Sequence, residues 1–340
     1  MAATAQQALT ELPPWLHRPW ERLQAAKAAG RLPHALLICG REGVGKNLFA
    51  SVLARALLCR DPGQFGLPCG RCEGCVLTEA GTHPDVQVCE PEVDAKTDRE
   101  KSVIGIDQVR AITDFVGLKP HYGGYKVVMI RPAERLNPYA ANSLLKTLEE
   151  PPGMAVLMLV SAHPGMLPAT IRSRCQRLLI GVPDRRATVS WLSSRLGSGT
   201  DAALLLDLAG GAPFAAFAMQ EQGILARRRQ MLDDLQAVAK GRADPVEIAE
   251  QWLKFGAKES LYWLYVWLVD MVRLQAADEP PILNNPDQRD RLAGLSAGAD
   301  IRRLLGRMDQ VLNAMRAGEG QANPQLLLEE ALISWLEIAA

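Results

Sequence analysis

A glycine-rich segment between a predicted strand and a predicted helix constrains this chain more than any other feature. The segment Gly40-Arg41-Glu42-Gly43-Val44-Gly45-Lys46-Asn47 follows the apolar run at 35–39 and leads into a stretch with helical apolar spacing at 48–54. A buried strand, a glycine-rich turn and a helix start are the context of a phosphate-binding loop. Gly40, Gly43 and Gly45 would let backbone N–H groups converge on an anion at the helix N-terminus. Lys46 would reach the outer phosphates of a nucleotide.

The end of this loop departs from the pattern of an ATPase. Ser or Thr normally follows the lysine because its hydroxyl holds Mg²⁺, but Asn47 stands there. A second buried strand, predicted at 126–130, should be followed by carboxylates that bind Mg²⁺ and orient water. Arg131-Pro132 follow it instead, and we interpret Glu134 as a solvated loop residue. The loop therefore predicts a phosphate site without the equipment for hydrolysis.

Four of the seven cysteines lie in one short segment, at spacings typical of a metal site. They are Cys59, Cys69, Cys72 and Cys75. Four thiolates fill a closed tetrahedral zinc site, so we predict a structural Zn²⁺ and not a zinc hydrolase centre. Gly70 and Gly74 lie between the ligands, where a tight chain reversal needs an unhindered backbone. The N-terminus has no charged segment followed by an apolar core, so we expect no export signal. We therefore expect the protein to work in the reducing cytoplasm, where thiols stay free to bind metal.

Composition and charge place the chain among ordinary globular proteins. Its 340 residues suffice for two or three domains, and Lys plus Arg balance Asp plus Glu at 38 each. No overall field would attract nucleic acid or a membrane, so any DNA contact must be local or shared with partners. The most apolar stretch, 261–269, ends at Asp270. It is shorter than the about 20 residues of a membrane span, which favours a buried helix.

The order of predicted elements divides the chain into three parts. Strands alternate with helices up to residue 182, which predicts an α/β domain with a parallel sheet covered on both faces. The cysteine-rich insert at about 59–75 belongs to this domain. A small helical domain at 183–224 and a larger helical domain at 225–340 follow, since helical periodicity dominates there.

Two further motifs resemble a known family. Ser143-Leu144-Leu145-Lys146-Thr147-Leu148-Glu149-Glu150-Pro151-Pro152, followed by Ser173-Arg174-Cys175, is similar to the AAA+ subunits of clamp loaders. The four-cysteine insert narrows the resemblance to the bacterial loader of DNA polymerase III. Its ATPase subunits (tau/gamma) keep a complete phosphate loop, so Asn47 and Arg131-Pro132 favour the delta-prime family. The resemblance implies a RecA-like α/β domain, a helical lid at 183–224 and an oligomerisation collar at 225–340.

The same resemblance implies a role without independent catalysis. Family members form a hetero-pentamer with tau/gamma and delta subunits, which loads the sliding clamp onto primer-template DNA with ATP, as part of the polymerase holoenzyme. Arg174 would be an arginine finger in trans, reaching ATP held by the adjacent ATPase subunit. The arginine guanidinium is planar and permanently charged, so its N–H groups can bind the negative charge that develops on a phosphoryl group during transfer. Pro213 stands where the family has an arginine that senses nucleotide.

Two alternatives stay open at the level of sequence. The chain could be a self-sufficient phosphate-loop ATPase in which the Asn47 amide oxygen coordinates Mg²⁺, and ATP binding without hydrolysis is also compatible with the loop. It could instead be a zinc-ribbon module that binds DNA, although the neutral charge argues against this. We interpret the basic cluster Arg227-Arg228-Arg229 as a solvated helix face.

Overall fold

The chain folds into two compact units, each with its own core. The computed structural model describes residues 12–94, 99–197, 199–318, 320 and 322–339. The first unit is Met1–Ser198 with Gly211–Ala215, and the second is Gly199–Gly210 with Ala216–Ala340. The predicted small helical domain at 183–224 is divided between the two units, and the three-domain organisation stays a prediction.

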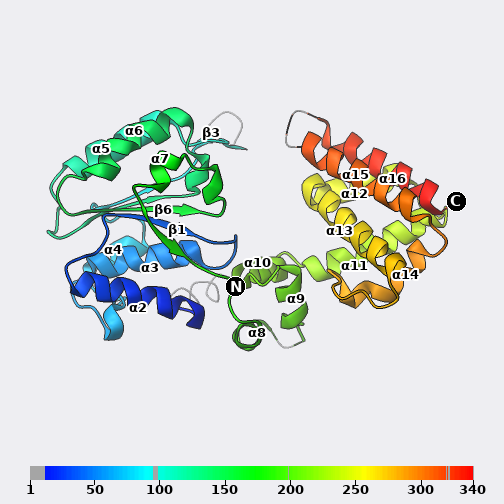
Figure 1. The fold of residues 1–340 in the computed structure, drawn as a ribbon, viewed down its shortest axis with the longest axis horizontal. Coiled ribbons are helices and arrows are strands. Elements are labelled where there is room, and N and C mark those ends of the chain that lie inside the picture. Colours follow the sequence, from blue (N-terminus) through cyan, green and yellow to red (C-terminus); the bar gives the residue numbers. More distant parts are fainter. Residues whose placement is uncertain (1–11, 95–98, 198, 319, 321, 340) are drawn as a thin grey trace. The chain divides into compact units, whose positions relative to one another are not determined.

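The first unit is built on a five-stranded parallel sheet (Figure 1). Its spatial order is β2-β5-β6-β1-β7. The strands are β1 (Ala35–Cys39), β2 (Val86–Cys89), β5 (Lys126–Ile130), β6 (Ala155–Ser161) and β7 (Gln176–Leu179). Leu36 of β1 is aligned with Met158 of β6 on one side and Gln176 of β7 on the other. The loop that follows β1 therefore emerges from the interior of the sheet.

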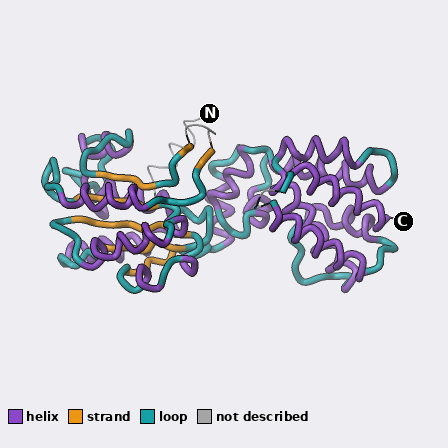
Figure 2. Tube along the Cα trace, turned by 90° about the horizontal axis from the view of Figure 1, so that it is seen from above, coloured by secondary structure: helices purple, strands orange, loops and turns teal. Residues whose placement is uncertain are grey.

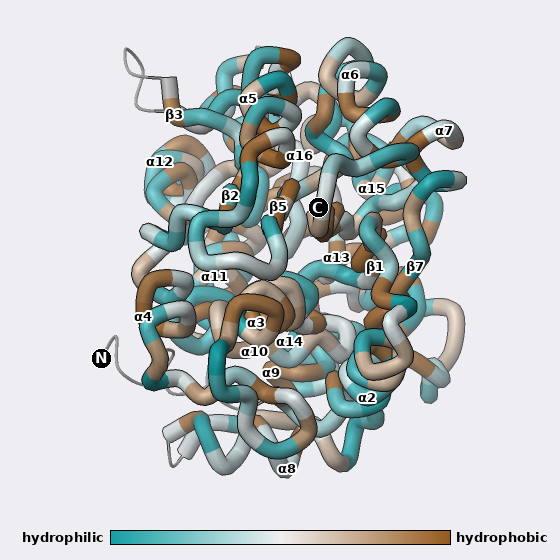
Figure 3. The backbone as a smooth tube through the Cα atoms, turned by 90° about the vertical axis from the view of Figure 1, so that its left-hand side faces the viewer, coloured by the Kyte–Doolittle hydropathy of each residue, from teal (hydrophilic) through white to brown (hydrophobic). Residues whose placement is uncertain are grey.

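Helices cover both faces of this sheet, which confirms the predicted fold class. One face carries α2 (Pro14–Ala28) and α3 (Lys46–Leu58), and the other carries α5 (Ile106–Gly117), α6 (Pro138–Glu149) and α7 (Ala169–Arg172). Because strand side chains alternate between faces, Leu36 packs with α2 and α3, whereas Leu37 packs with α5 and α6. In Figure 3 the apolar residues of α3 stand out, in keeping with the burial of most of that helix.

Shorter elements complete the first unit. They are η1 (Gln64–Gly66), α4 (Glu73–Glu79), β3 (Val93–Asp94), β4 (Arg99–Glu100), η2 (Ala133–Arg135), η3 (Pro164–Met166) and α8 (Arg185–Ser193). The polar run at 90–102, which reads as an exposed loop, contains the antiparallel pair β3 and β4. Lys101 closes this pair, because its N–H donates to the Glu92 carbonyl and its ammonium contacts the Glu92 carboxylate at 2.6 Å.

The described residues of the second unit form helices and the loops that connect them, without a strand (Figure 2). Its elements are α9 (Ala202–Leu208), most of α10 (Pro213–Glu221), α11 (Ile224–Ala239), α12 (Pro245–Phe255), α13 (Ala257–Ala276), η4 (Pro286–Gln288), α14 (Arg289–Ser296), α15 (Ile301–Ala317) and α16 (Pro324–Ala339). Asp201, Asp244 and Asp300 cap the N-termini of α9, α12 and α15 by accepting a backbone N–H.

The core of the second unit gathers around α13, which packs against α12, α14, α15 and α16. Four tryptophans are buried in it. They are Trp252, Trp263, Trp267 and Trp335. No single described helix is long and apolar enough to cross a membrane.

One basic residue of this unit differs from its prediction. Arg228, expected on a solvated helix face, is only 1% exposed. Its Nη2 donates to Asn285 Oδ1 at 2.7 Å and contacts Asp287 Oδ1 at 3.2 Å. Asp270 in turn accepts both the backbone N–H and the side-chain N–H of Asn285. A buried cation needs such partners, so this network fixes the connection between α13 and α14 onto α11.

Candidate functional site

The four predicted zinc ligands converge in the first unit. The sulfur atoms of Cys59, Cys69, Cys72 and Cys75 all lie within 4.8 Å of one another. Two of the separations are 4.0 Å, from Cys69 to Cys75, and 3.8 Å, from Cys72 to Cys59. Four sulfurs placed about 2.3 Å from one zinc ion in a tetrahedron are about 3.8 Å apart. Disulfides would need about 2.05 Å, so the donor set fits a metal ion.

Local structure explains how the sulfurs meet. Cys59 follows the last turn of α3, and Cys72 is the residue before α4. Gly70 turns the chain between them at φ +74°, a conformation that favours glycine. Gly74 has another reason to lack a side chain: a Cβ there would lie 2.4 Å from the Leu58 carbonyl oxygen. Thus α3 and α4 approach closely enough to share one metal.

The thiols differ in their readiness to ionise. Burial would raise the pKa of Cys72, but backbone N–H groups and the neighbouring thiols lower it to about 6. Burial raises the pKa of Cys75 to about 12. Backbone N–H groups also donate to Cys59 and Cys69, both at 3.3 Å, which suits thiolate ligands. A bound cation would favour the ionised form of all four.

A buried carboxylate, Asp85, holds the loop at 121–122, which lies beside the insert. Asp85, fully buried, accepts the backbone N–H groups of His121 and Tyr122 and lies 3.4 Å from the Lys126 ammonium. Burial would raise the pKa of Asp85, but these hydrogen bonds and the ammonium lower it below its ordinary value. His83 is not among the ligands, since its Nδ1 accepts the backbone N–H of Asp85.

The predicted phosphate-binding loop has the expected backbone shape. Gly43 and Gly45 take φ values of +76° and +101°, and α3 begins directly after Gly45. The Lys46 ammonium, however, donates to the Arg41 carbonyl within the loop at 2.8 Å. Desolvation lowers the pKa of Lys46, although nearby Glu134 and Glu42 oppose this. The lysine would have to leave its present partner to reach a phosphate.

Residues from a distant segment cover this loop. The backbone N–H of Phe214, near the start of α10, donates to the Gly43 carbonyl at 2.9 Å. A Cβ at Gly43 would lie 2.6 Å from Ala215 Cβ, and one at Gly45 would lie 2.9 Å from the Phe214 ring. The two glycines therefore permit close packing by this chain's own residues, a second use of the features that make an anion cradle.

An aromatic cluster holds this cover in place. The rings of Trp15, Trp191 and Phe214 lie between 4.8 and 6.2 Å from one another, edge to face. The Trp15 indole N–H donates to the Val44 carbonyl in the loop at 2.9 Å. Sequence reasoning missed this cluster because its members come from three separate elements, and no local spacing connects them.

The positions that would hold Mg²⁺ in an ATPase are engaged otherwise. Asn47 is exposed on the first turn of α3. At the end of β5, Arg131 donates to the Glu90 carboxylate at 2.6 Å. The solvated role expected of Glu134 is wrong, because its Oε1 accepts the backbone N–H groups of Ala162 and His163 after β6. Glu134 thus joins the ends of two strands.

Arg174, the predicted arginine finger, lies just after α7 and is about one-third exposed. Its Nε donates to Glu149 Oε1 at 2.6 Å, and its Nη2 contacts the same oxygen. Its Nη1 donates to the Thr170 carbonyl at 3.0 Å. Both quoted sequence motifs therefore meet in one ion pair.

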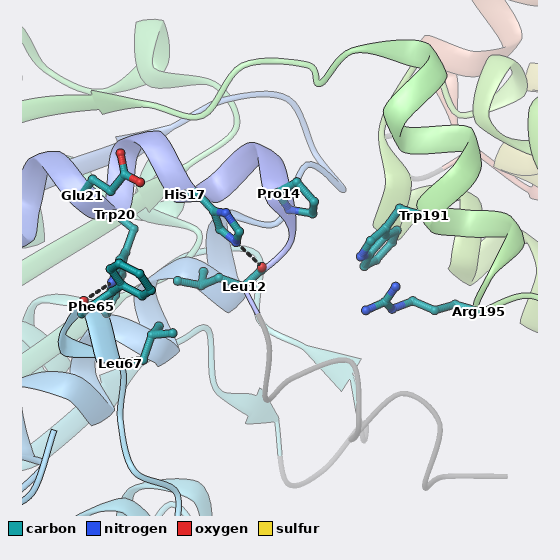
Figure 4. A pocket seen from close by; sticks show the side chains of 9 residues that line it. All are labelled: Leu12, Pro14, His17, Trp20, Glu21, Phe65, Leu67, Trp191 and Arg195. Carbon is teal, nitrogen blue, oxygen red and sulfur yellow. Dashed lines mark hydrogen bonds between the residues drawn. The ribbon is translucent and has the colours of Figure 1, made fainter. Parts of the chain in front are cut away.

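An apolar pocket of about 550 Å³ lies beside the insert (Figure 4). Trp20 of α2 lines it and donates its indole N–H to the Phe65 carbonyl at 3.0 Å. Phe65 is 78% exposed and has φ +57°, which is unusual for an aromatic residue. The spacing of residues gave no signal for this pocket.

Comparisons with known proteins identify relatives among the subunits of DNA polymerase III. A family described as "DNA polymerase III, delta subunit" matches residues 16–183, and one described as "DNA polymerase III, delta subunit, C terminal" matches 222–337. The DNA polymerase III subunit delta' of Pseudomonas aeruginosa is 35% identical over 94% of this chain and 97% of its own length. The tau/gamma subunit of Haemophilus influenzae is 40% identical over 43% of this chain and 20% of its own length.

Among solved structures, one match is the gamma subunit-related protein of Thermotoga maritima, 18% identical, with a TM-score of 0.48, covering 94% of this chain and 99% of that one. The relationship to delta' extends over both compact units and nearly the whole of the curated relative. The chain belongs to the family of DNA polymerase III delta' subunits.

Proposed function

We propose that this chain is a clamp-loader subunit that does not hydrolyse ATP itself and donates Arg174 to ATP held by an adjacent tau/gamma-type subunit. The observation that carries the proposal is the contrast between two sites. The chain's own loop packs against Phe214 and Ala215, and Arg131-Pro132 directly follow β5 in place of carboxylates, whereas Arg174 is partly exposed with donors to spare. The complete clamp loader would use ATP to load the sliding clamp onto primer-template DNA.

The partners follow from the family. A delta' subunit would join tau/gamma and delta subunits in a hetero-pentamer, with the C-terminal helices forming a collar. Exposed apolar side chains on α16, including Leu326 and Ile333, support a role of that helix in contacts with other subunits. The chromosome of a bacterial cell lies in the cytoplasm, so a replicative polymerase subunit would act there.

The bound metal would be a structural Zn²⁺. Cys59, Cys69, Cys72 and Cys75 would hold it, and four thiolates leave no position for a reacting water. When bound, the ion would cross-link α3 and α4. The chain's own residues, above all Asp85 with Lys126, would hold the neighbouring loop in place.

Replacing Arg174 by Ala in a reconstituted loader tests the proposal. An arginine finger in trans is worth about 10³–10⁵ in rate, so turnover at the one site that Arg174 serves should fall by about that factor. Single-turnover hydrolysis with clamp and primed DNA measures it, and gel filtration checks assembly. Arg172→Ala is a matched control, since Arg172 is an exposed arginine at the end of α7, two residues before Arg174. Unchanged hydrolysis in the Arg174 variant would refute the assigned role.

The second candidate, a self-sufficient ATPase, depends on the preserved backbone shape of Gly43 and Gly45. It predicts steady-state hydrolysis by the purified chain alone, abolished by Lys46→Ala. The proposal made here predicts no hydrolysis above background without tau/gamma partners.

A further inference from the structure

We infer that Glu149 is a positioning residue that presents Arg174 to the neighbouring subunit's ATP, an inference that rests on the function proposed above. Glu149 Oε1 accepts from Arg174 Nε at 2.6 Å and contacts Nη2. The Thr170 carbonyl accepts from Nη1 at 3.0 Å. The guanidinium is thus gripped from two elements, the end of α6 and the start of α7.

Counting donors indicates which part of the guanidinium stays available. Arginine has five N–H donors in one plane, and the contacts with Glu149 and Thr170 use three of them. One N–H on each terminal nitrogen of Arg174 remains. Two parallel N–H groups are the fork with which arginine grips phosphate oxygens. Glu149 therefore occupies the Nε side of the guanidinium and leaves one N–H on each terminal nitrogen for a phosphoryl group.

The location of Glu149 supports a role beyond helix stability. It is the last residue of α6, where the helix dipole disfavours a carboxylate. The neighbouring guanidinium offsets this local cost. The side chains of Arg174 and Glu149 are 32% and 48% exposed, and ion pairs this exposed stabilise a fold little. What the pair provides is orientation: without it, the long arginine side chain would sample many rotamers and meet the phosphoryl group only part of the time.

The test uses the complete loader with tau/gamma, delta, sliding clamp and primed DNA. We expect Glu149→Ala to lower turnover at the Arg174-dependent site about tenfold. Glu149→Gln, which keeps an acceptor oxygen at the same distance, should recover part of the loss. Glu150→Ala is the matched control, because Glu150 is the exposed neighbour, and it should leave turnover unchanged.

A double-mutant cycle separates positioning from a general structural effect. In the Arg174→Ala background, Glu149→Ala should cause no further loss, since there is no guanidinium left to orient. An unchanged rate in the single Glu149→Ala variant, or equal losses in both backgrounds, would overturn the inference. If Arg174→Ala itself had no effect, the proposed function would fall first, so the two failures are distinguishable. In the isolated chain, Glu149→Ala should also shift the NMR resonance of the Arg174 Nε–H group, and an unmoved resonance would contradict the contact.

Discussion

Single side chains in this protein act through partners that are remote in sequence, and Asp85 is the clearest case. Its carboxylate, fully buried, joins the 121–122 backbone to the Lys126 ammonium, which also lies 4.0 Å from the centre of the Phe115 ring. Removing one partner of a buried ion pair leaves the other charge without compensation, which is more costly than an apolar replacement of both. The network therefore makes Asp85 a point of vulnerability in the first unit.

Asp85→Asn should lower the free energy of unfolding of the first unit by about 3–5 kcal/mol, because Lys126 would remain buried without its counter-charge. Urea denaturation measures the loss, and Asp114→Asn on the exposed face of α5 is the control. The pKa of Asp85 is lowered in the folded state, so its contribution is complete above the ordinary value of 3.8 and is lost as pH falls through the folded pKa. The two proteins should converge in stability in strong acid. A constant difference down to pH 2 would contradict this account.

Which residues could be predicted depended on whether their partners are local. The four cysteines were readable because a metal site has short, regular spacing, and the structure brings all four together. Arg228 and Glu134 were misread as solvated, since Arg228 bonds to residues 57–60 positions away and Glu134 to backbone 28–29 positions away. A charged residue in a polar sequence gives no sign of such partners. Whether Arg174 meets a nucleotide remains a prediction.

At the scale of elements, the insert between α3 and α4 has little apolar core of its own. The segment 60–67 is largely exposed, and the Arg60–Glu73 ion pair at its base is exposed as well. Such a segment needs a cross-link to hold one conformation. The strands, by contrast, are buried over their whole length in β1, β5 and β6 and need no metal.

Removing the metal should therefore loosen residues 60–76 and leave the sheet intact. A strong chelator is expected to raise hydrogen exchange at those amides by at least tenfold, while amides of β1 and β6 stay protected. Metal affinity should fall as pH drops, because protons compete for the thiolates. Cys72→Ser should reproduce the effect of the chelator, and Cys175→Ser, a buried cysteine outside the cluster, should not. Uniform loss of protection across the sheet would contradict this division.

The covered phosphate loop gives a second prediction about elements. The start of α10 packs against Gly43 and Gly45, and we expect ATP binding to displace it. Removing the Phe214 ring weakens the cover by about 0.5–1.5 kcal/mol, so Phe214→Ala should bind ATP up to about tenfold more tightly than the parent chain. Isothermal titration measures both affinities. Phe65→Ala, an exposed ring outside the cluster, is the control, and equal affinities in all three proteins would show that the cover does not oppose binding.

Over the whole molecule, one unit carries Arg174 and the other carries the helical core around α13. The sequence indicated where strands give way to helices, but it did not indicate the boundary between the two compact units. α8 packs with the sheet unit through Trp191, whereas α9 belongs with the helices. The sequence has helical periodicity on both sides of this boundary, so only tertiary contacts reveal where the boundary lies. On the function proposed above, we predict that attachment to the loader and stimulation of its ATPase depend on different units.

A fragment of residues 199–340, which contains α9 and the rest of the helical unit, separates these two roles. If the helical unit makes the attachment, the folded fragment should displace the full chain from tau/gamma and delta subunits without supplying Arg174. Loader ATPase activity should then fall as the fragment is added, and circular dichroism would check that the fragment is helical. Trp252→Ala removes a fully buried ring at a cost of about 3–5 kcal/mol, so this variant of the fragment should compete poorly. A well-folded fragment that neither displaced the full chain nor lowered activity would move the attachment site to the sheet unit.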